Sequence, residues 1–176
     1  MNVLVLGANG QIAREATDLF LKQTDARLTL YLRNAKRLKV AGSDERIRVV
    51  EGDVLDLKTL GAAMAGQDVA YANLSGQMEE QARNIVKAMD AGYVKRLIFI
   101  SSMGIYGEVP GETYRSVLDP YRNSARVIEA SDLDYTIVRP AWLNNRDDVD
   151  YETTQKGEAF KNPSGAVSRK SVGSSC

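Results

Sequence analysis

The chain has 176 residues, of which 44% are hydrophobic and 26% charged, with 23 basic and 23 acidic side chains. This length and composition indicate a single globular domain, residues 1–176, with a sizeable core. The balanced charge gives no general electrostatic reason to expect nucleic acid or an anionic membrane as a partner. No apolar run approaches the length of a membrane span, and the chain enters a predicted strand without a signal segment, so we expect a cytoplasmic protein.

Two residue types that carry much enzyme chemistry are scarce. There is no histidine, and the single cysteine is Cys176. These facts exclude a Ser–His–Asp mechanism, remove the commonest zinc ligand and leave no disulfide framework or thiolate metal site. We therefore expect no metal ion and a small-molecule substrate, and leave the oligomeric state open between monomer and homodimer.

Short apolar runs alternate with helical patterns along most of the chain. We predict strands over residues 3–6, 28–32, 47–51, 68–72, 97–101 and 135–138. Between them we predict helices over residues 11–22, 34–40, 57–65, 76–91 and 121–130. Asp56 is expected to cap the third of these helices by accepting hydrogen bonds from first-turn amides. The alternation predicts an α/β fold, a Rossmann-like doubly wound parallel sheet with helices on both faces.

Two segments do not follow the alternation. Residues 104–118 are rich in glycine and polar residues, and residues 139–176 are polar and turn-rich with weak periodicity. Both would leave strand ends on the side of the sheet where ligands bind in such folds. We therefore predict that they form the substrate-side loops.

The most informative segment is residues 3–13, where the run Val-Leu-Val-Leu passes into Gly-Ala-Asn-Gly-Gln-Ile-Ala. A buried strand reads as such an aliphatic run, and glycines let the following turn approach a phosphate closely. The next helix offers free N–H groups and the positive end of its dipole. The spacing of Gly7, Gly10 and Ala13 predicts a dinucleotide site. We expect the cofactor to contact Gly7, Asn9, Gly10, Gln11 and Ile12.

The residues after the second strand bear on the choice between NAD and NADP. An acidic residue at this position favours NAD, because it binds the ribose hydroxyls and repels a 2′-phosphate. This chain instead has Arg33, with Arg37 one helical turn further on. A guanidinium can bind a phosphate through two hydrogen bonds, so we expect NADP rather than NAD. The alternative is that both arginines belong to a solvated helix start.

Three motifs together carry a family resemblance. They are the glycine turn, the pair Ser101-Ser102 at a strand end, and the run Leu-Asp-Tyr-Thr-Ile-Val-Arg-Pro at residues 133–140. With these motifs, residues 1–172 resemble the atypical short-chain dehydrogenase/reductases, in their NmrA-like and biliverdin-reductase-B-like NAD(P)H-binding branch. Members of this group usually continue past residues 168–172 with another helix and strand. The C-terminal part of this chain therefore looks truncated.

The resemblance implies further cofactor contacts. It places Asp53 at the adenine amino group and Val54 against the adenine ring. It also brings Asn73, Leu74 and Ser75 beneath the ribose and pyrophosphate, with Ser101 nearby. Capping of a turn is a compatible role for Asp53, and residues 73–75 could also simply end a strand.

The resemblance also defines the catalytic question. Typical members of the superfamily use a Ser, a Tyr and a Lys four residues after the Tyr, on one helix face. Here Ser101 and Ser102 occupy the serine position, but Tyr121 is followed at the lysine position by Ala125. Arg126 is one residue late, about 140° around the helix from Tyr121. The usual proton relay is therefore incomplete. The candidates for a catalytic role are Ser102, Tyr121 and Tyr106. The alternative role of Tyr121 is to pack the start of the helix.

Reduction remains compatible with an incomplete relay, because hydride transfer is the chemistry of the cofactor. A readily reduced planar acceptor, such as a quinone, a flavin or a conjugated carbonyl, needs no strong acid. Trp142 offers a flat apolar wall for such a ring, and Arg139 is the second predicted substrate residue; lid or core packing is the alternative for Trp142. We therefore predict an NADPH-dependent oxidoreductase. The alternatives are a non-enzymatic, redox-sensing NADP-binding regulator of the NmrA-like type, and a cofactor domain with an incomplete substrate site.

Overall fold

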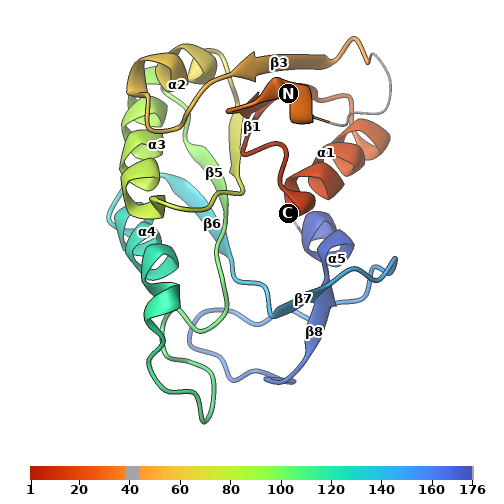
Figure 1. Cartoon of the computed structure of the whole chain (residues 1–176), viewed down its shortest axis with the longest axis vertical. Helices are drawn as coiled ribbons and strands as arrows, with labels where there is room; N and C mark the ends of the chain where they lie inside the picture. Colours follow the sequence, from red (N-terminus) through yellow and green to blue (C-terminus); the bar gives the residue numbers. More distant parts are fainter. Residues whose placement is uncertain (39–43, 176) are drawn as a thin grey trace.

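The core of the protein is a six-stranded parallel sheet in the order β3-β2-β1-β4-β5-β6, seen in a computed structural model that describes residues 1–38 and 44–175 (Figure 1). The strands are β1 (Asn2–Leu6), β2 (Arg27–Leu32), β3 (Ile47–Glu51), β4 (Val69–Ala72), β5 (Arg96–Ile100) and β6 (Asp134–Val138). The central strands β1 and β4 are almost fully buried, whereas the edge strands β3 and β6 are largely exposed. This is the strand order of a Rossmann fold, and it confirms the predicted fold class.

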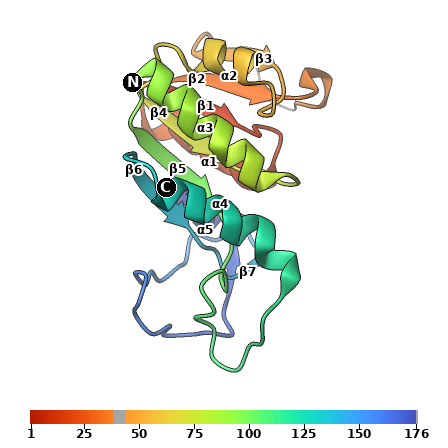
Figure 2. The ribbon, with the colours of Figure 1, turned by 90° about the vertical axis from the view of Figure 1, so that its left-hand side faces the viewer.

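Helices cover both faces of the sheet (Figure 2). One face carries α2 (Leu57–Met64), α3 (Met78–Gly92) and α4 (Asp119–Glu129), and the other carries α1 (Gln11–Gln23) and α5 (Arg169–Ser174). The core is accordingly divided into two clusters. One holds the apolar residues of α2, α3 and α4, such as Leu60, Ile85 and Ile128. The other holds Ile12 and Ala16 of α1 together with Val172 of α5.

Most predicted elements are present with ends shifted by one or two residues. Asp56 caps α2 as predicted, accepting hydrogen bonds from the amides of Lys58 and Thr59. The helix predicted from residue 76 begins at Met78, because Gly76 has a φ of +89° that no right-handed helix contains. The helix predicted from residue 121 begins at 119, with a proline in its first turn, where a missing N–H is tolerated.

The predicted helix over residues 34–40 is wrong as a full helix. The described part contains only the 3₁₀ turn η1 (Ala35–Arg37), and residues 39 and 40 lie outside the described residues. A second 3₁₀ turn, η2 (Ser116–Leu118), leads directly into α4. Within the described residues, no helix combines the length and apolarity that crossing a membrane requires.

The C-terminal segment is more ordered than its polar sequence predicts. Strands β7 (Trp142–Asn144) and β8 (Ala166–Ser168) form a separate two-stranded parallel sheet, followed by α5. Each strand has only three residues and pairs with a partner more than 20 residues away, so no local periodicity marks it. This small sheet lies at the same end of the molecule as residues 104–118 (Figures 1 and 2).

Candidate functional site

The carboxyl ends of three adjacent strands form the centre of the candidate site. Leu6 pairs with Ala72, and Ala72 pairs with Phe99 on the next strand. Because neighbouring strands are about 4.8 Å apart, the residues after β1, β4 and β5 lie within about 10 Å of one another. The strand order reverses between β1 and β4, and open α/β sheets bind their ligands at such a reversal.

The glycine turn after β1 packs tightly against the end of β4. Gly7 has a φ of +74°, and its amide and that of Ala8 donate to the carbonyl of Tyr31 at 3.0 and 3.3 Å. A Cβ at Gly7 would overlap the carbonyl oxygen of Asn73, and a Cβ at Gly10 would overlap the amide nitrogen of the Asn73 side chain. Gly7 is therefore needed to seat this turn, whatever ligand approaches it, whereas a Cβ at Gly10 would meet the movable end of the Asn73 side chain.

The amino end of α1 is open to an anion. Gly10 occupies the N-cap position, no side chain caps the helix there, and the first turn contains no acidic residue. Asn9 is partly buried in the preceding turn, Gln11 is exposed and Ile12 is buried. First-turn amides without a cap and the positive end of the helix dipole favour a phosphate at this position. The turn therefore fits the pyrophosphate of a dinucleotide.

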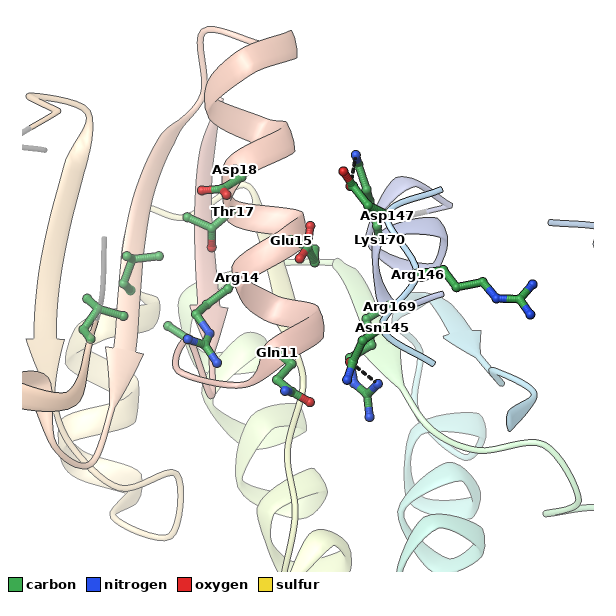
Figure 3. A pocket seen from close by; sticks show the side chains of 13 residues that line it. Gln11, Arg14, Glu15, Thr17, Asp18, Asn145, Arg146, Asp147, Arg169 and Lys170 are labelled. Atoms are coloured by element: carbon green, nitrogen blue, oxygen red, sulfur yellow. Dashed lines mark hydrogen bonds and ion pairs between the residues drawn. The ribbon is translucent and has the colours of Figure 1, made fainter. Parts of the chain in front are cut away.

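A cavity of about 360 Å³ lies between α1 and the C-terminal segment (Figure 3). Gln11 and Arg14 line it from α1, and Arg169 lines it from α5, facing Gln11. The Arg169 guanidinium donates to the carbonyl of Asn144 at 3.0 Å and to Oδ1 of Asn145 at 2.7 Å. Sequence reasoning missed Arg14 and Arg169, because only the packing of α5 on α1 forms the cavity that both of them line.

The predicted adenosine side lies beyond β2 and β3. Arg33 and Arg37 are both exposed in the turn after β2. Asp53 is partly buried, and its Oδ1 accepts from the amide of Leu55 at 3.0 Å, so the turn-capping role is present. Val54 is only 5% exposed, because it packs in the core cluster of α2 and α3. Little of its side chain is left for a ligand ring.

Residues 73–75 follow β4 directly, at the centre of the site. Asn73 and Leu74 are partly buried, whereas Ser75 is exposed. The amide of Asn73 donates to the carbonyl of Leu6 at 3.0 Å, which extends the ladder by one bond past β4. These residues therefore form part of the surface against which the glycine turn packs.

Two serines follow β5. Ser101 is 7% exposed, its amide donates to the carbonyl of Val138 at 2.8 Å, and its hydroxyl has no hydrogen-bond partner within the described residues. A buried polar group without a partner costs about 1–3 kcal/mol, so this hydroxyl is suited to meet a ligand. Ser102 is partly buried and donates to the carbonyl of Met103 at 3.1 Å.

Tyr106 belongs to a charged cluster that the sequence did not reveal. Its hydroxyl donates to Oε1 of Glu129 at 2.6 Å, and Lys156 contacts the same oxygen at 2.6 Å. Burial, together with this hydrogen bond, raises the pKa of Tyr106. Arg139 lies 5.0 Å from the Tyr106 ring centre and forms an ion pair with Glu108 at 2.6 Å. The hydroxyl proton of Tyr106 and the charge of Arg139 are thus both already bound by carboxylates of the protein.

Helix α4 carries Tyr121 and the position at which the resemblance predicts a lysine. Tyr121 is partly buried and packs against the core, in agreement with the alternative role of packing the helix start. Ala125, one turn later, is completely buried. Arg126 is exposed and lines the cavity between residues 104–118 and α4 instead. No cation of α4 therefore occupies the position of the missing lysine.

A second cavity, of about 480 Å³, lies between residues 104–118 and α4. Its volume falls within the range of small-molecule sites, roughly 300–1,000 Å³. Gly104 lines it, so Ser102 is at most about 8 Å of chain away. Trp142 is 56% exposed at the start of β7, and the Arg115 guanidinium lies 5.5 Å from its ring centre. Trp142 thus lies beside a residue of the cavity wall rather than in the core.

Comparison with known proteins identifies the class to which this fold and site belong. Residues 7–176 match a family described as NAD(P)H-binding. The chain belongs to this NAD(P)H-binding family, which confirms the resemblance to atypical short-chain dehydrogenase/reductases.

Individual relatives agree with this assignment. A Rossmann-fold NAD(P)-binding family protein from Shigella flexneri is 45% identical, with a TM-score of 0.83 over 98% of this chain and 82% of that one. A short-chain dehydrogenase/reductase from Veillonella parvula in complex with NADP is 29% identical, with a TM-score of 0.85 over 99% and 84%. A Bacillus subtilis protein named as the uncharacterized sugar epimerase YhfK is 28% identical over 82% of this chain and 73% of its own length. The chain is thus shorter than these relatives.

Proposed function

We propose that this protein is an NADPH-dependent oxidoreductase that transfers hydride to a small planar acceptor, such as a quinone, a flavin or a conjugated carbonyl. The observation that carries this proposal is the convergence of the glycine turn, Asn73 and the unpartnered Ser101 hydroxyl at one sheet edge. A hydroxyl that is buried but unpaired, beside an uncapped helix start, is the arrangement expected where a polar ligand completes the site.

Three groups of residues would hold the cofactor. Residues 9–12 would bind the pyrophosphate through the amides of the α1 amino end, and Ser101 would meet the ribose or nicotinamide side. Arg33 would bind a 2′-phosphate, and the NADP complex of the Veillonella parvula relative supports this choice over NAD. Bound NADPH would supply the hydride, which is chemistry that no side chain of this protein provides.

The protein would contribute orientation and a hydrogen-bond donor. Ser102 is the proposed donor for an acceptor carbonyl, because in the chain it stands between the end of β5 and Gly104, which lines the cavity of residues 104–118. A donor aimed at developing negative charge typically contributes a factor of about 10²–10³ in rate. Tyr121 remains a candidate proton donor, whereas Tyr106 already donates its proton to Glu129. The cavity between residues 104–118 and α4, with Trp142 near its wall, is the proposed acceptor site.

The test combines cofactor binding with turnover. Titration calorimetry with NADP⁺ and NAD⁺ is expected to show tighter binding of NADP⁺. NADPH oxidation, followed by absorbance against a panel of quinones, flavins and aldehydes, is expected to show turnover of at least one planar acceptor. A protein that binds neither nucleotide would contradict the whole proposal.

One observation favours a second function. The lysine position is a buried alanine, which suits a protein that binds NADP without catalysing a reaction. Tight binding of NADP⁺ with no oxidation across the panel would support this non-enzymatic, redox-sensing regulator and overturn the reductase.

A further inference from the structure

An acidic side chain at the end of β3 faces the turn that carries Arg33. Leu32 and Glu51 are the last paired residues of β2 and β3. The amide of Ala35 donates to Oε2 of Glu51 at 2.9 Å. The carboxylate therefore lies at the start of η1, two residues beyond Arg33, although Glu51 is 18 residues later in the chain.

The turn after β2 carries positively charged side chains, and the Glu51 carboxylate beside it is negative. Arg33, Lys36 and Arg37 are all exposed there, and Glu51 is exposed among them. Within the described residues Glu51 forms no ion pair with any of the three cations. A backbone amide, rather than a guanidinium, holds the carboxylate in place. Its negative charge is consequently directed at the same small region as the cationic turn.

We propose that Glu51 is a second determinant of cofactor choice, which weakens the binding of a 2′-phosphate and permits a 2′-hydroxyl. A phosphate at this turn would bind the Arg33 guanidinium through charge-assisted hydrogen bonds. Glu51, which the Ala35 amide holds beside this turn, repels a group that carries nearly two negative charges. This inference rests on the proposed binding of NADP through Arg33.

The opposite effect is expected for NAD. A ribose 2′-hydroxyl can donate to a carboxylate, as it does to the acidic residue that follows the second strand in NAD-preferring Rossmann folds. In this protein β3 would supply that carboxylate, while Arg33 occupies the usual position. The protein is therefore expected to bind both nucleotides, with a smaller preference for NADP than Arg33 alone would produce.

The variant Glu51→Gln removes the negative charge of the side chain but keeps its size and shape. Its side-chain amide oxygen can still accept from Ala35, so the turn is retained while the negative charge is removed. Glu45→Gln is the matched control, because Glu45 is also exposed but precedes the other end of β3. Both variants change the net charge equally. Affinities for NADP⁺, NAD⁺, 2′,5′-ADP and 5′-AMP are measured by calorimetry at low and high salt.

In Glu51→Gln we expect about tenfold tighter binding of NADP⁺ and of 2′,5′-ADP, and about threefold weaker binding of NAD⁺. The gain should shrink at high salt because it is electrostatic. Glu45→Gln should change every affinity less than twofold. A purely structural Glu51 would alter all four ligands in parallel, and a NADP⁺/NAD⁺ ratio within twofold of the wild type would overturn the inference while leaving the proposed function intact. A wild type that binds neither nucleotide would overturn both.

Discussion

Arg33 is the residue on which the predicted cofactor preference depends. It is exposed at the end of β2, where it is free to meet a ligand. We expect Arg33→Ala to weaken NADP⁺ binding by about 10–100-fold, because a charge-assisted hydrogen bond contributes about 1.5–3 kcal/mol. NAD⁺ binding should change less than threefold. Arg27→Ala, at the opposite end of the same strand, is the calorimetric control. Equal losses for the two nucleotides would contradict a phosphate-binding role.

Ser102 and Tyr106 are expected to differ in their effect on turnover. The Tyr106 proton is already donated to Glu129, and burial raises the pKa of this phenol, so it is poorly suited to protonate an acceptor. We expect Tyr106→Phe to lower kcat less than tenfold and Ser102→Ala to lower it about a hundredfold. Initial rates of NADPH oxidation with the best acceptor measure both. A larger loss in Tyr106→Phe than in Ser102→Ala would reverse the assignment.

At the scale of elements, the glycine turn shows that a ligand motif can also be a packing requirement. Gly7→Ala places a Cβ against the Asn73 carbonyl at a positive φ. We expect it to destabilise the protein by about 3 kcal/mol, measured by urea unfolding, from overpacking and left-handed strain together. Gly107→Ala is the control, since Gly107 has a φ of +71° but an open environment. It should lose only about 1 kcal/mol; similar losses at both positions would show that packing on Asn73 contributes nothing.

Elements that neighbouring residues stabilise are predicted correctly from the sequence. Elements that depend on contacts with residues far away in the chain are not. The aliphatic run of β1 and the capped helix α2 are correct within a residue, because burial on both faces and an Asp cap act locally. Strands β7 and β8 were missed, since three-residue strands are stabilised only by each other. The short turn η1 replaced a predicted helix for a related reason: it has no buried residue, so no apolar face packs it against the sheet.

At the scale of the molecule, one charged cluster ties three distant segments together. Glu129 of α4 binds Tyr106 from residues 104–118 and Lys156 from the loop between β7 and β8. Arg139, after β6, binds Glu108 and also contacts the Tyr106 ring. Hydrogen bonds to Glu129 therefore attach both predicted substrate-side segments to α4. Tyr106, Glu129 and Lys156 of this cluster also line the second cavity.

The cluster should make the stability of the folded protein depend on pH. Burial raises the pKa of Glu129, but hydrogen bonds from Lys156 and Tyr106 outweigh it and hold the pKa below its ordinary value. Glu129 therefore stabilises the folded state above about pH 4.3, the ordinary value, and this contribution is lost as the pH falls through the lower folded pKa.

We expect Glu129→Gln to have a lower Tm than the wild type at pH 6, with the difference shrinking toward pH 3. Differential scanning fluorimetry across this range measures it. Glu152→Gln, at an exposed glutamate in the same loop as Lys156, should show no such trend. A Tm difference for Glu129→Gln that is independent of pH would exclude a contribution from its ionised form.

The sequence by itself determined the fold class and the glycine turn, because strand burial, helix periodicity and glycine geometry are properties of neighbouring residues. Together with the family resemblance, it also predicted that the usual lysine position holds Ala125. Only the tertiary structure decided which side chains meet: Asn73 beneath the glycines, Glu51 at the Ala35 amide, and Glu129 between Tyr106 and Lys156. These pairs join residues 16 to 66 positions apart in the chain. No local pattern encodes such contacts, because they arise only when strands and helices pack against one another.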